Sequence, residues 1–266
     1  MSGEDKVLAI DVGNTNLVLG MFDGDSLTVS WRLTTLPGRT PDELWVLVSR
    51  LLSNDSIETE QITGVVMSSV VPPMTQAVDE MVSLRLGRQA LRVDATNAGL
   101  PIRYENPAEV GADRLVNAVA ARELYGASTR PLIVVDFGTA TTFDAISGTG
   151  EYLGGVICPG IEISEEALFL RAARLPKVDV LKPAELIGRT TVGSMQSGLF
   201  YGCVAMVEGI VGRLRDELAG DGQAVCVATG GLASSITSET SVIDHVNPDL
   251  TLTGLRLVWE RNQGGH

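Results

Sequence analysis

Cysteine, histidine and aromatic residues are all scarce in this 266-residue sequence. The three cysteines, Cys158, Cys203 and Cys226, form no CxxC pair and are odd in number. This argues against a disulfide framework and a cysteine zinc site, and it indicates a reducing compartment. Two histidines, His245 and His266, are too few for a histidine-based metal cluster. Aromatic residues make up 5% of the chain, so the core must be mostly aliphatic.

Positive charge is also scarce. The chain has 20 Lys and Arg against 33 Asp and Glu, a formal net charge of −13. Such an acidic protein binds phosphate backbones and anionic membranes poorly, so we expect no nucleic-acid and no membrane partner. Any anion must bind at a local site of backbone amides, hydroxyls, a metal or one or two arginines.

Long hydrophobic runs are lacking as well. No apolar run approaches the roughly 18 residues of a membrane span. The polar residues 1–6 contain no apolar signal segment. We therefore expect a soluble, cytoplasmic protein. The GxxxxGK[ST] and GxGxxG motifs are absent too, which argues against a P-loop enzyme and a standard dinucleotide binder.

What the sequence does contain is an alternation of strands and helices in a chain long enough for two domains. Strands are predicted at 7–12, 17–22, 27–33, 64–71, 91–93, 131–137, 141–146, 151–157 and 224–228. Helices are predicted at 72–86, 108–125, 162–173, 192–218 and 254–261, and one that Thr40 caps and Pro41 opens.

The two halves begin alike. Each has a hydrophobic strand, then Asp-x-Gly, a short polar residue and a returning strand, in Ile10-Asp11-Val12-Gly13-Asn14-Thr15 and Val135-Asp136-Phe137-Gly138-Thr139-Ala140. This weak internal repeat predicts two similar α/β domains. We place them at residues 1–115 and 116–266, with the first loop in one and the second loop in the other.

The Asp-x-Gly turns can handle phosphate. Glycine lets the backbone bend tightly and bring its amides close to an anion, and Asn14, Thr15 and Thr139 add side-chain donors. Asp11, at a strand end, can hold Mg²⁺ through water. A pair of ordinary β-turns is the alternative interpretation, which the equivalent placement of the two turns makes less favoured.

The sequence resembles one family, the type III pantothenate kinases, over essentially its whole length. The motifs that carry the resemblance are residues 10–16, 68–72, 104–107, 111–117, 136–142, 154–160, 187–191, 229–231 and 250–256. Thr190 stands where the family often has Asn, and Gly193 where it often has an acid. The resemblance implies two domains of duplicated ribonuclease H-like topology, as in actin, Hsp70 and sugar kinases.

The resemblance further implies ATP-dependent phosphorylation of the primary hydroxyl of pantothenate, the first step of coenzyme A biosynthesis. The implied ATP contacts are Asp11, Val12, Gly13, Asn14, Thr15, Asn16, Leu17, Val18 and Thr139. The implied pantothenate contacts are Tyr104, Gly111, Ala112, Asp113, Arg114 and Thr191. Asp113 would be the catalytic base, and Asp136 would bind a monovalent cation, K⁺ or NH₄⁺. A homodimer is implied, with the long helix at 192–218 as its interface.

Several of these residues also have simpler interpretations. Asp113 and Arg114 could be a solvated pair at a helix start, although Arg114 could equally bind the substrate carboxylate and, with the helix N-terminus, keep Asp113 ionised. Tyr104 could be a packing aromatic, and Asp136 a strand-end cap. Thr191 could N-cap the long helix. Gly230-Gly231 could admit an adenine ring or form a plain turn.

Two other functions compete with a kinase. A non-catalytic regulator could keep the fold, but its sequence would be expected to lose Asp11, Asp113 or Asp136, and all three are present. A phosphoanhydride hydrolase would keep Asp11 but has no need to combine Tyr104 with residues 111–114.

Overall fold

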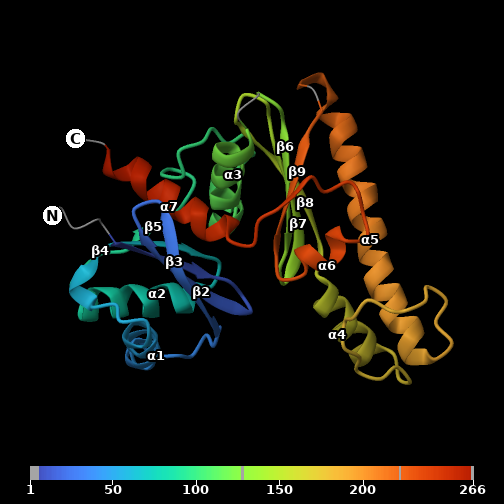
Figure 1. Cartoon of the computed structure of the whole chain (residues 1–266), viewed down its shortest axis with the longest axis horizontal. Coiled ribbons are helices and arrows are strands. Elements are labelled where there is room, and N and C mark those ends of the chain that lie inside the picture. The colour runs from blue at the N-terminus through green and yellow to red at the C-terminus, as the bar shows by residue number, and fades with distance from the viewer. Residues whose placement is uncertain (1–5, 127–128, 222, 265–266) are drawn as a thin grey trace. The chain divides into compact units, whose positions relative to one another are not determined.

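The computed structural model describes residues 6–126, 129–221 and 223–264. Residues 1–5, which carry most of the expectation about a signal segment, and the last two tail residues lie outside the described residues. The chain forms two units. Figure 1 labels their helices and strands. Unit 1 contains Met1–Leu100, Tyr104–Ala120 and Asp249–His266, and unit 2 contains Pro101–Arg103 and Ala121–Pro248.

This division differs from a single boundary at residue 115 because the closing helix returns to the first unit. α7 (Leu250–Gln263) packs against β1 and β4 of unit 1. Its Gly254 comes so close to the Val116 carbonyl that a Cβ would lie 2.0 Å from that oxygen. A Cβ on Gly64 of β4 would lie 2.2 Å from the Trp259 ring of the same helix. Because Gly64 and Gly254 have no side chains, α7 can lie directly against unit 1.

Unit 1 is built on a five-stranded sheet with the order β3-β2-β1-β4-β5. Its strands are β1 (Lys6–Val12), β2 (Asn16–Asp23), β3 (Ser26–Thr34), β4 (Ile62–Ser69) and β5 (Leu91–Arg92). β1 pairs antiparallel with β2 and parallel with β4, so β1 is central and its apolar residues are buried. Its helices are α1 (Pro41–Asn54), α2 (Pro72–Met81) and α7, together with the first part of α3 (Ala112–Tyr125), whose residues from Ala121 on belong to unit 2.

Unit 2 repeats this topology with the sheet order β10-β9-β6-β7-β8. Its strands are β6 (Leu132–Phe137), β7 (Ala140–Ile146), β8 (Tyr152–Pro159), β9 (Val225–Gly230) and β10 (His245–Val246). α4 (Ile161–Arg171), α5 (Thr191–Glu217) and α6 (Ala233–Thr237) accompany them. Because the central strand is again paired antiparallel with the next strand and parallel with a later one, the repeat predicted from the sequence is confirmed.

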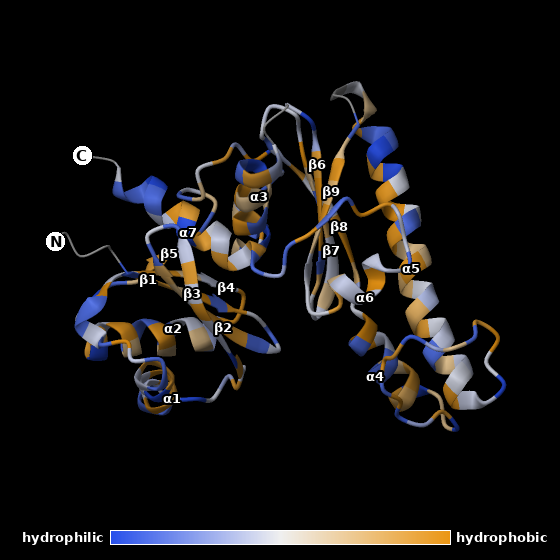
Figure 2. Ribbon diagram, viewed as in Figure 1, coloured by the Kyte–Doolittle hydropathy of each residue, from blue (hydrophilic) through white to orange (hydrophobic). Residues whose placement is uncertain are grey.

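Hydrophobic residues are frequent in the strands of both sheets (Figure 2), and the buried ones form one core cluster in each unit. The start of α1 shows why local sequence fixes an element. Thr40 accepts a hydrogen bond from the Glu43 N–H, and the Glu43 carboxylate accepts one from the Thr40 N–H, while Pro41 supplies the first turn. This reciprocal pair is a capping box, as the cap and proline predict.

Several element boundaries differ from the predicted ones. The helix at 72–86 ends at Met81 and continues as a π-helical turn, Val82–Leu86, that ends at Gly87 with φ 61°. The helix at 108–125 begins only at Ala112, after a 3-10 turn at Pro107–Glu109. α6 and β10 are too short to have given a hydrophobic pattern.

One helix of the described chain, α5, is long and apolar enough by length and composition to cross a membrane. The core helix of a soluble protein meets the same criterion. α5 buries Val204, Val207 and Val211, among others, in the core of unit 2.

Candidate active site

The first phosphate loop is the turn between β1 and β2. The Gly13 N–H donates to the Asn16 carbonyl over 3.0 Å, which closes the turn. The Thr35 hydroxyl donates to the Gly13 carbonyl over 2.7 Å, and the Thr35 N–H donates to the Thr15 carbonyl over 2.9 Å. Bonds from outside the turn therefore hold its backbone in one shape. Its side chains at Asn14 and Thr15 are exposed, where a phosphate could meet them.

The other predicted ATP contacts of this loop continue into the sheet. Val12 and Leu17 face each other across the β1–β2 pair and are buried in the core. Asn16 and Val18 are partly exposed at the start of β2. Val12 and Leu17 can therefore support the loop, and their side chains do not reach solvent.

Asp11 lies one residue before the end of β1, beside Ser68 of the parallel strand β4. The Ser68 hydroxyl is fully buried and donates to Asp11 Oδ1 over 2.7 Å. This bond orients the carboxylate and uses one of its oxygens. Ser68 belongs to one of the family motifs, but its role toward Asp11 was not predicted from the sequence. The signal that could have found it is a polar residue in a hydrophobic strand that pairs with β1.

The start of α3 carries the candidate base. Asp113 is the second residue of the helix, and its Oδ1 accepts a hydrogen bond from the Arg114 N–H over 2.8 Å. A Cβ on Gly111 would lie 2.5 Å from this oxygen, so only glycine leaves room for the carboxylate. The same Cβ would lie 3.6 Å from Val70 Cγ1. Ala112 and Arg114 are buried beside them.

Val70 connects this helix start to the first phosphate loop. Its N–H donates to the Val12 carbonyl over 3.1 Å, and its side chain lies next to Gly111. The predicted segments around Asp11 and Asp113 are thus brought together within unit 1. Val70 was not predicted as a site residue, because nothing in its type distinguishes it from a core valine.

Burial raises the pKa of the Asp113 carboxyl above its ordinary value. The Arg114 N–H and guanidinium lower that pKa, but the loss of hydration outweighs them. Arg114 and the helix N-terminus thus oppose the rise in the Asp113 pKa without cancelling it. Because Arg114 is buried, the interpretation as a solvated pair is wrong. A carboxylate with a raised pKa is a stronger base toward a hydroxyl proton.

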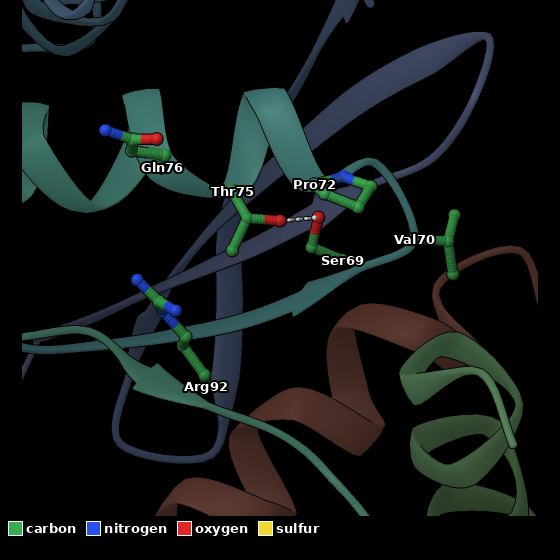
Figure 3. Close-up of a pocket in the computed structure, with 6 residues that line it drawn as sticks. All are labelled: Ser69, Val70, Pro72, Thr75, Gln76 and Arg92. Carbon is green, nitrogen blue, oxygen red and sulfur yellow. Dashed lines mark hydrogen bonds between the residues drawn. The ribbon is translucent and has the colours of Figure 1, made fainter. Parts of the chain in front are cut away.

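A pocket of about 310 Å³ lies in unit 1 at the carboxyl ends of β4 and β5 (Figure 3). Its lining residues are Ser69, Val70, Pro72, Thr75, Gln76 and Arg92. The polar groups that line it are engaged within the chain: the Thr75 hydroxyl donates to Ser69 Oγ over 2.6 Å, and Arg92 pairs with Asp79. The pocket reaches the candidate site through Val70.

The second phosphate loop joins β6 and β7 in unit 2. The Gly138 N–H donates to the Ala140 carbonyl over 3.1 Å. Gly160 lies directly against this turn, since a Cβ there would be 2.2 Å from the Thr139 carbonyl oxygen. A side chain at residue 160 would thus displace the loop that carries Thr139. Gly160 belongs to one of the family motifs, and its contact with the Thr139 carbonyl was not predicted from the sequence.

Asp136 lies one residue before the end of β6, in the position that Asp11 has in β1. Gly230 has φ 91°, and a Cβ there would lie 2.6 Å from the Phe137 carbonyl oxygen and 2.7 Å from Asp136 Oδ1. A carbonyl and a carboxylate oxygen therefore converge on a space that a side chain would fill. Oxygen atoms of this kind are the ligands that K⁺ takes from proteins.

Metal ligands of other kinds do not gather elsewhere. In the part of the chain that the structure describes, no three His, Cys, Asp or Glu side chains form a metal-binding group. Mg²⁺ in kinase sites keeps several waters and takes few protein ligands besides the substrate phosphates. Asp11, held by Ser68, has the chemistry for such a water-mediated contact.

The two remaining predicted residues, Tyr104 and Thr191, lie in parts of the chain other than the two phosphate loops. Tyr104 is half-buried in the segment that precedes the 3-10 turn Pro107–Glu109. Thr191 is the first residue of α5, and it is exposed. The cap of α5 is Thr190, whose hydroxyl accepts from the Gly193 N–H over 3.0 Å. The alternative interpretation of Thr191 as the N-cap is therefore wrong, and its side chain has no capping duty.

Comparisons with known proteins identify the family of this chain. A family model described as type III pantothenate kinase matches residues 7–213. A protein of that name from Moorella thermoacetica is 53% identical over 257 residues, which cover 96% of this chain and 99% of the relative. Another from Brevibacillus brevis is 51% identical over 258 residues, which cover 97% and 99%.

Solved structures support the fold alone. A structure described as a conserved putative Baf family transcriptional activator from Campylobacter jejuni matches with a TM-score of 0.58 at 17% identity, covering 96% of this chain and 98% of that one. MreB 5 of Spiroplasma citri, bound to AMPPNP, matches with a TM-score of 0.54 at 11% identity, covering 97% of each chain. The actin-like, duplicated architecture expected from the sequence is thereby confirmed. By its sequence motifs, its fold and its full-length relatives, the chain belongs to the type III pantothenate kinase family.

Proposed function

We propose that this chain transfers the γ-phosphoryl group of ATP to the primary hydroxyl of pantothenate, with Asp113 as the base. The observation that carries the proposal is the Asp113 carboxylate, half-buried at the start of α3 and packed against Gly111. Membership of the pantothenate kinase family names the substrate.

In the proposed reaction the bond from the pantothenate hydroxyl oxygen to the γ-phosphorus forms as the bond from that phosphorus to the ADP oxygen breaks. The hydroxyl proton passes to Asp113, whose raised pKa suits it to accept one. Positioning and charge neutralisation supply most of the remaining catalysis in phosphoryl transfer. Arg114 contributes by binding the substrate carboxylate and by opposing the full rise of the Asp113 pKa.

The two turns hold the nucleotide in this proposal. The backbone from Asp11 to Val18 and the exposed side chains of Asn14 and Thr15 contact the phosphates, with Val12 and Leu17 supporting the loop from the core, and Thr139 contacts ATP from the second turn. Asp11 would hold Mg²⁺ through water, and Asp136, with the Phe137 carbonyl, would hold K⁺ or NH₄⁺. Mg²⁺ would neutralise the phosphate charge that develops in the transition state. Tyr104, residues 111–114 and Thr191 contact pantothenate.

The decisive test is an ADP-release assay with and without pantothenate, in the presence of ATP, Mg²⁺ and K⁺. We expect ADP only when pantothenate is present. ADP without pantothenate would indicate a phosphoanhydride hydrolase instead. No ADP under either condition, from protein that still binds ATP, would indicate a non-catalytic regulator of the same fold.

We also propose that the protein is a cytoplasmic homodimer that pairs through α5. Small residues form a stripe along this helix at 4–3–4–3 spacing, namely Gly198, Gly202, Ala205, Gly209 and Gly212. Gly198, Gly202 and Ala205 are exposed, and a Cβ on Gly198, Gly202 or Gly212 would meet nothing within 4 Å. Each glycine costs a helix interior about 1 kcal/mol relative to alanine, and nothing in the described chain requires it there.

A second helix packed closely on this stripe would account for the glycines. Large apolar side chains are also exposed on α4 and on the segment that leads into α5: Phe169, Leu170, Leu181, Leu186, Ile187 and Val192. An apolar surface of this kind favours a protein partner. The proposed partner is a second copy of the chain.

Light scattering at micromolar concentration tests the dimer. We expect twice the 28.2 kDa chain mass for the natural protein and a shift toward the monomer for Gly202→Leu. Gly220→Leu is the matched control, because a Cβ there also meets nothing within 4 Å and Gly220 follows α5. A monomeric natural protein would refute the proposal.

A further inference from the structure

A short segment of the chain leaves unit 1 and joins the sheet of unit 2. Pro101–Arg103 belongs to unit 2, while Leu100 and Tyr104 on either side belong to unit 1. We call this segment the clip. Its Ile102 forms a parallel bridge with Tyr152 at the start of β8, the edge strand of the unit 2 sheet.

Backbone and side-chain bonds both fasten the clip. The Tyr152 N–H donates to the Pro101 carbonyl, and the Arg103 N–H donates to the Tyr152 carbonyl, each over 2.8 Å. The Arg103 guanidinium donates to Glu151 Oε1 through Nε over 2.8 Å, and its terminal nitrogen lies 2.5 Å from the same oxygen. Two adjacent residues of unit 2 thus hold Arg103 from its backbone and from its side chain.

The point to which the clip is fastened is itself fixed. Tyr152 is fully buried, and its hydroxyl donates to Asp144 Oδ1 over 2.7 Å. Asp144 lies on β7, is fully buried, and accepts a longer contact from the Thr142 hydroxyl at 3.5 Å. β7 begins directly after the second phosphate loop. A continuous path of covalent and hydrogen bonds therefore runs from that loop to the clip.

We infer that Arg103 and Glu151 are positioning residues for pantothenate, because they fix the chain one residue before Tyr104. This inference rests on the proposed role of Tyr104 in binding pantothenate. The turn that follows is bonded within itself: the Glu109 N–H donates to the Asn106 carbonyl over 3.0 Å, and Asn106 Nδ2 donates to Glu109 Oε1 over 2.9 Å. Those bonds fix the shape of the turn, whereas the clip fixes the point at which the chain leaves unit 2, one residue before Tyr104.

A purely structural role for the clip would give a different result. A segment that only covers the exposed edge of β8 protects the sheet from pairing with other chains. Its loss would lower stability or solubility and leave substrate constants unchanged. A positioning role instead predicts a raised KM for pantothenate at unchanged KM for ATP.

The experiment compares Arg103→Ala, Glu151→Ala and the exchanged pair Arg103→Glu with Glu151→Arg. An ion pair this exposed predicts a modest effect, so we expect the pantothenate KM to rise about three- to fivefold in each alanine variant. The exchanged pair should return it to within about twofold of the natural value. Arg103→Pro also removes the N–H that donates to Tyr152, and its pantothenate KM should rise about tenfold or more.

Lys182→Ala is the matched control, because it removes another exposed ion pair of unit 2, Lys182 with Glu239 at 2.6 Å. We expect it to change neither KM. Tyr104→Ala is measured in parallel, alone and combined with Arg103→Ala, and the second substitution should add little once Tyr104 is gone.

The outcomes separate this inference from the proposed function. Unchanged pantothenate KM in Arg103→Ala and Arg103→Pro, with a raised KM in Tyr104→Ala, would overturn the positioning role alone. Independent, multiplicative effects of Arg103→Ala and Tyr104→Ala would overturn it as well. Unchanged KM in Tyr104→Ala would overturn both this inference and the placement of Tyr104 in the pantothenate site.

Discussion

Asp11 and Asp136 hold the same position in two sheets of the same strand order, yet their surroundings differ. Each precedes a glycine turn by two residues, and each lies beside a parallel strand, β4 or β9. The residue paired with Asp11 is Ser68, and the residue paired with Asp136 is Thr229. Both partners are buried hydroxyl residues, so the duplication extends to the polar position inside the sheet.

The next position along the parallel strand separates the two sites. Ser69 ends β4, and its hydroxyl bonds the Thr75 side chain at the start of α2. Gly230 ends β9 at φ 91°, and the Phe137 carbonyl and Asp136 Oδ1 converge on the space that its missing side chain leaves. One residue thus separates a strand end closed by a side-chain hydrogen bond from a strand end at which a carbonyl and a carboxylate oxygen approach a glycine. This difference is the basis for proposing a monovalent cation beside Asp136 and not beside Asp11.

The largest expected effect concerns Asp113, a carboxylate of unit 1 that has no counterpart among the predicted site residues of unit 2. Asp113→Asn keeps the shape but removes the proton acceptor, so kcat should fall by about two to four orders of magnitude. The KM for ATP should change little, since the first loop is held by Thr35 and Asn16. Steady-state kinetics with both substrates varied would check this.

Gly111→Ala is the companion variant. Its Cβ would lie 2.5 Å from Asp113 Oδ1, so it displaces the base without removing it, and kcat should fall as well. Near-normal kcat in Asp113→Asn would move the base elsewhere. Loss of ATP binding in that variant would make Asp113 a structural residue.

The second prediction concerns a substitution at Gly230 in unit 2. Gly230→Ala places a Cβ 2.6 Å from the Phe137 carbonyl oxygen and forces alanine to φ 91°. A strained backbone of this kind costs about 1–3 kcal/mol, so thermal unfolding should shift to lower temperature, and activation by K⁺ should be lost. Gly231→Ala is the control, because its Cβ meets nothing within 4 Å. Equal behaviour of the two variants would show that the Gly230 position holds no ion.

The third prediction compares the two aspartates directly. Activity should need K⁺ or NH₄⁺ and fall severalfold in buffer that contains only Na⁺. Asp136→Asn should remove this dependence on the monovalent ion, whereas Asp11→Asn should raise the Mg²⁺ concentration required. Initial rates over a series of each salt would measure both. Equal rates of the natural protein in K⁺ and Na⁺ would contradict the assignment of Asp136.

Features of the fold that depend on neighbouring residues could be predicted from the sequence, whereas features that depend on distant contacts could not. The Thr40 cap, the three-strand start of each half and the Asp-x-Gly turns were predictable, because each is specified by neighbouring residues. The return of α7 to unit 1 was not, since it depends on Gly64 and Gly254 meeting residues far away in the sequence. Short elements such as α6 were missed because five residues carry no usable periodicity.

The candidate site divides in the same way. Its loops and the Asp113 segment were named from the sequence, but Ser68, Val70 and the clip acquire their roles only through contacts across the fold. The direction of the Asp113 pKa shift was also out of reach. The sequence shows the adjacent arginine and helix start, which lower the pKa, whereas burial, which raises it, is a property of the packed unit.

The smallest expected effect concerns stability and tests that burial. Because the pKa of Asp113 is raised in the folded protein, the folded state binds the proton more tightly than the unfolded state does. The folded state of the natural protein is therefore stabilised when Asp113 is protonated, and this contribution to stability is lost as the pH rises through the raised pKa.

The asparagine side chain of the Asp113→Asn variant cannot ionise, so this variant should unfold at a slightly higher temperature than the natural protein at neutral pH. The difference should shrink as the pH falls below the ordinary carboxyl range, where both side chains are neutral. Paired melting curves across the pH range would measure it, with Asp42→Asn on the exposed first turn of α1 as the control. A variant less stable than the natural protein at neutral pH would mean that Asp113 is stabilised by its hydrogen bond to Arg114 more than it is penalised by burial, and the base would then have an ordinary or lowered pKa.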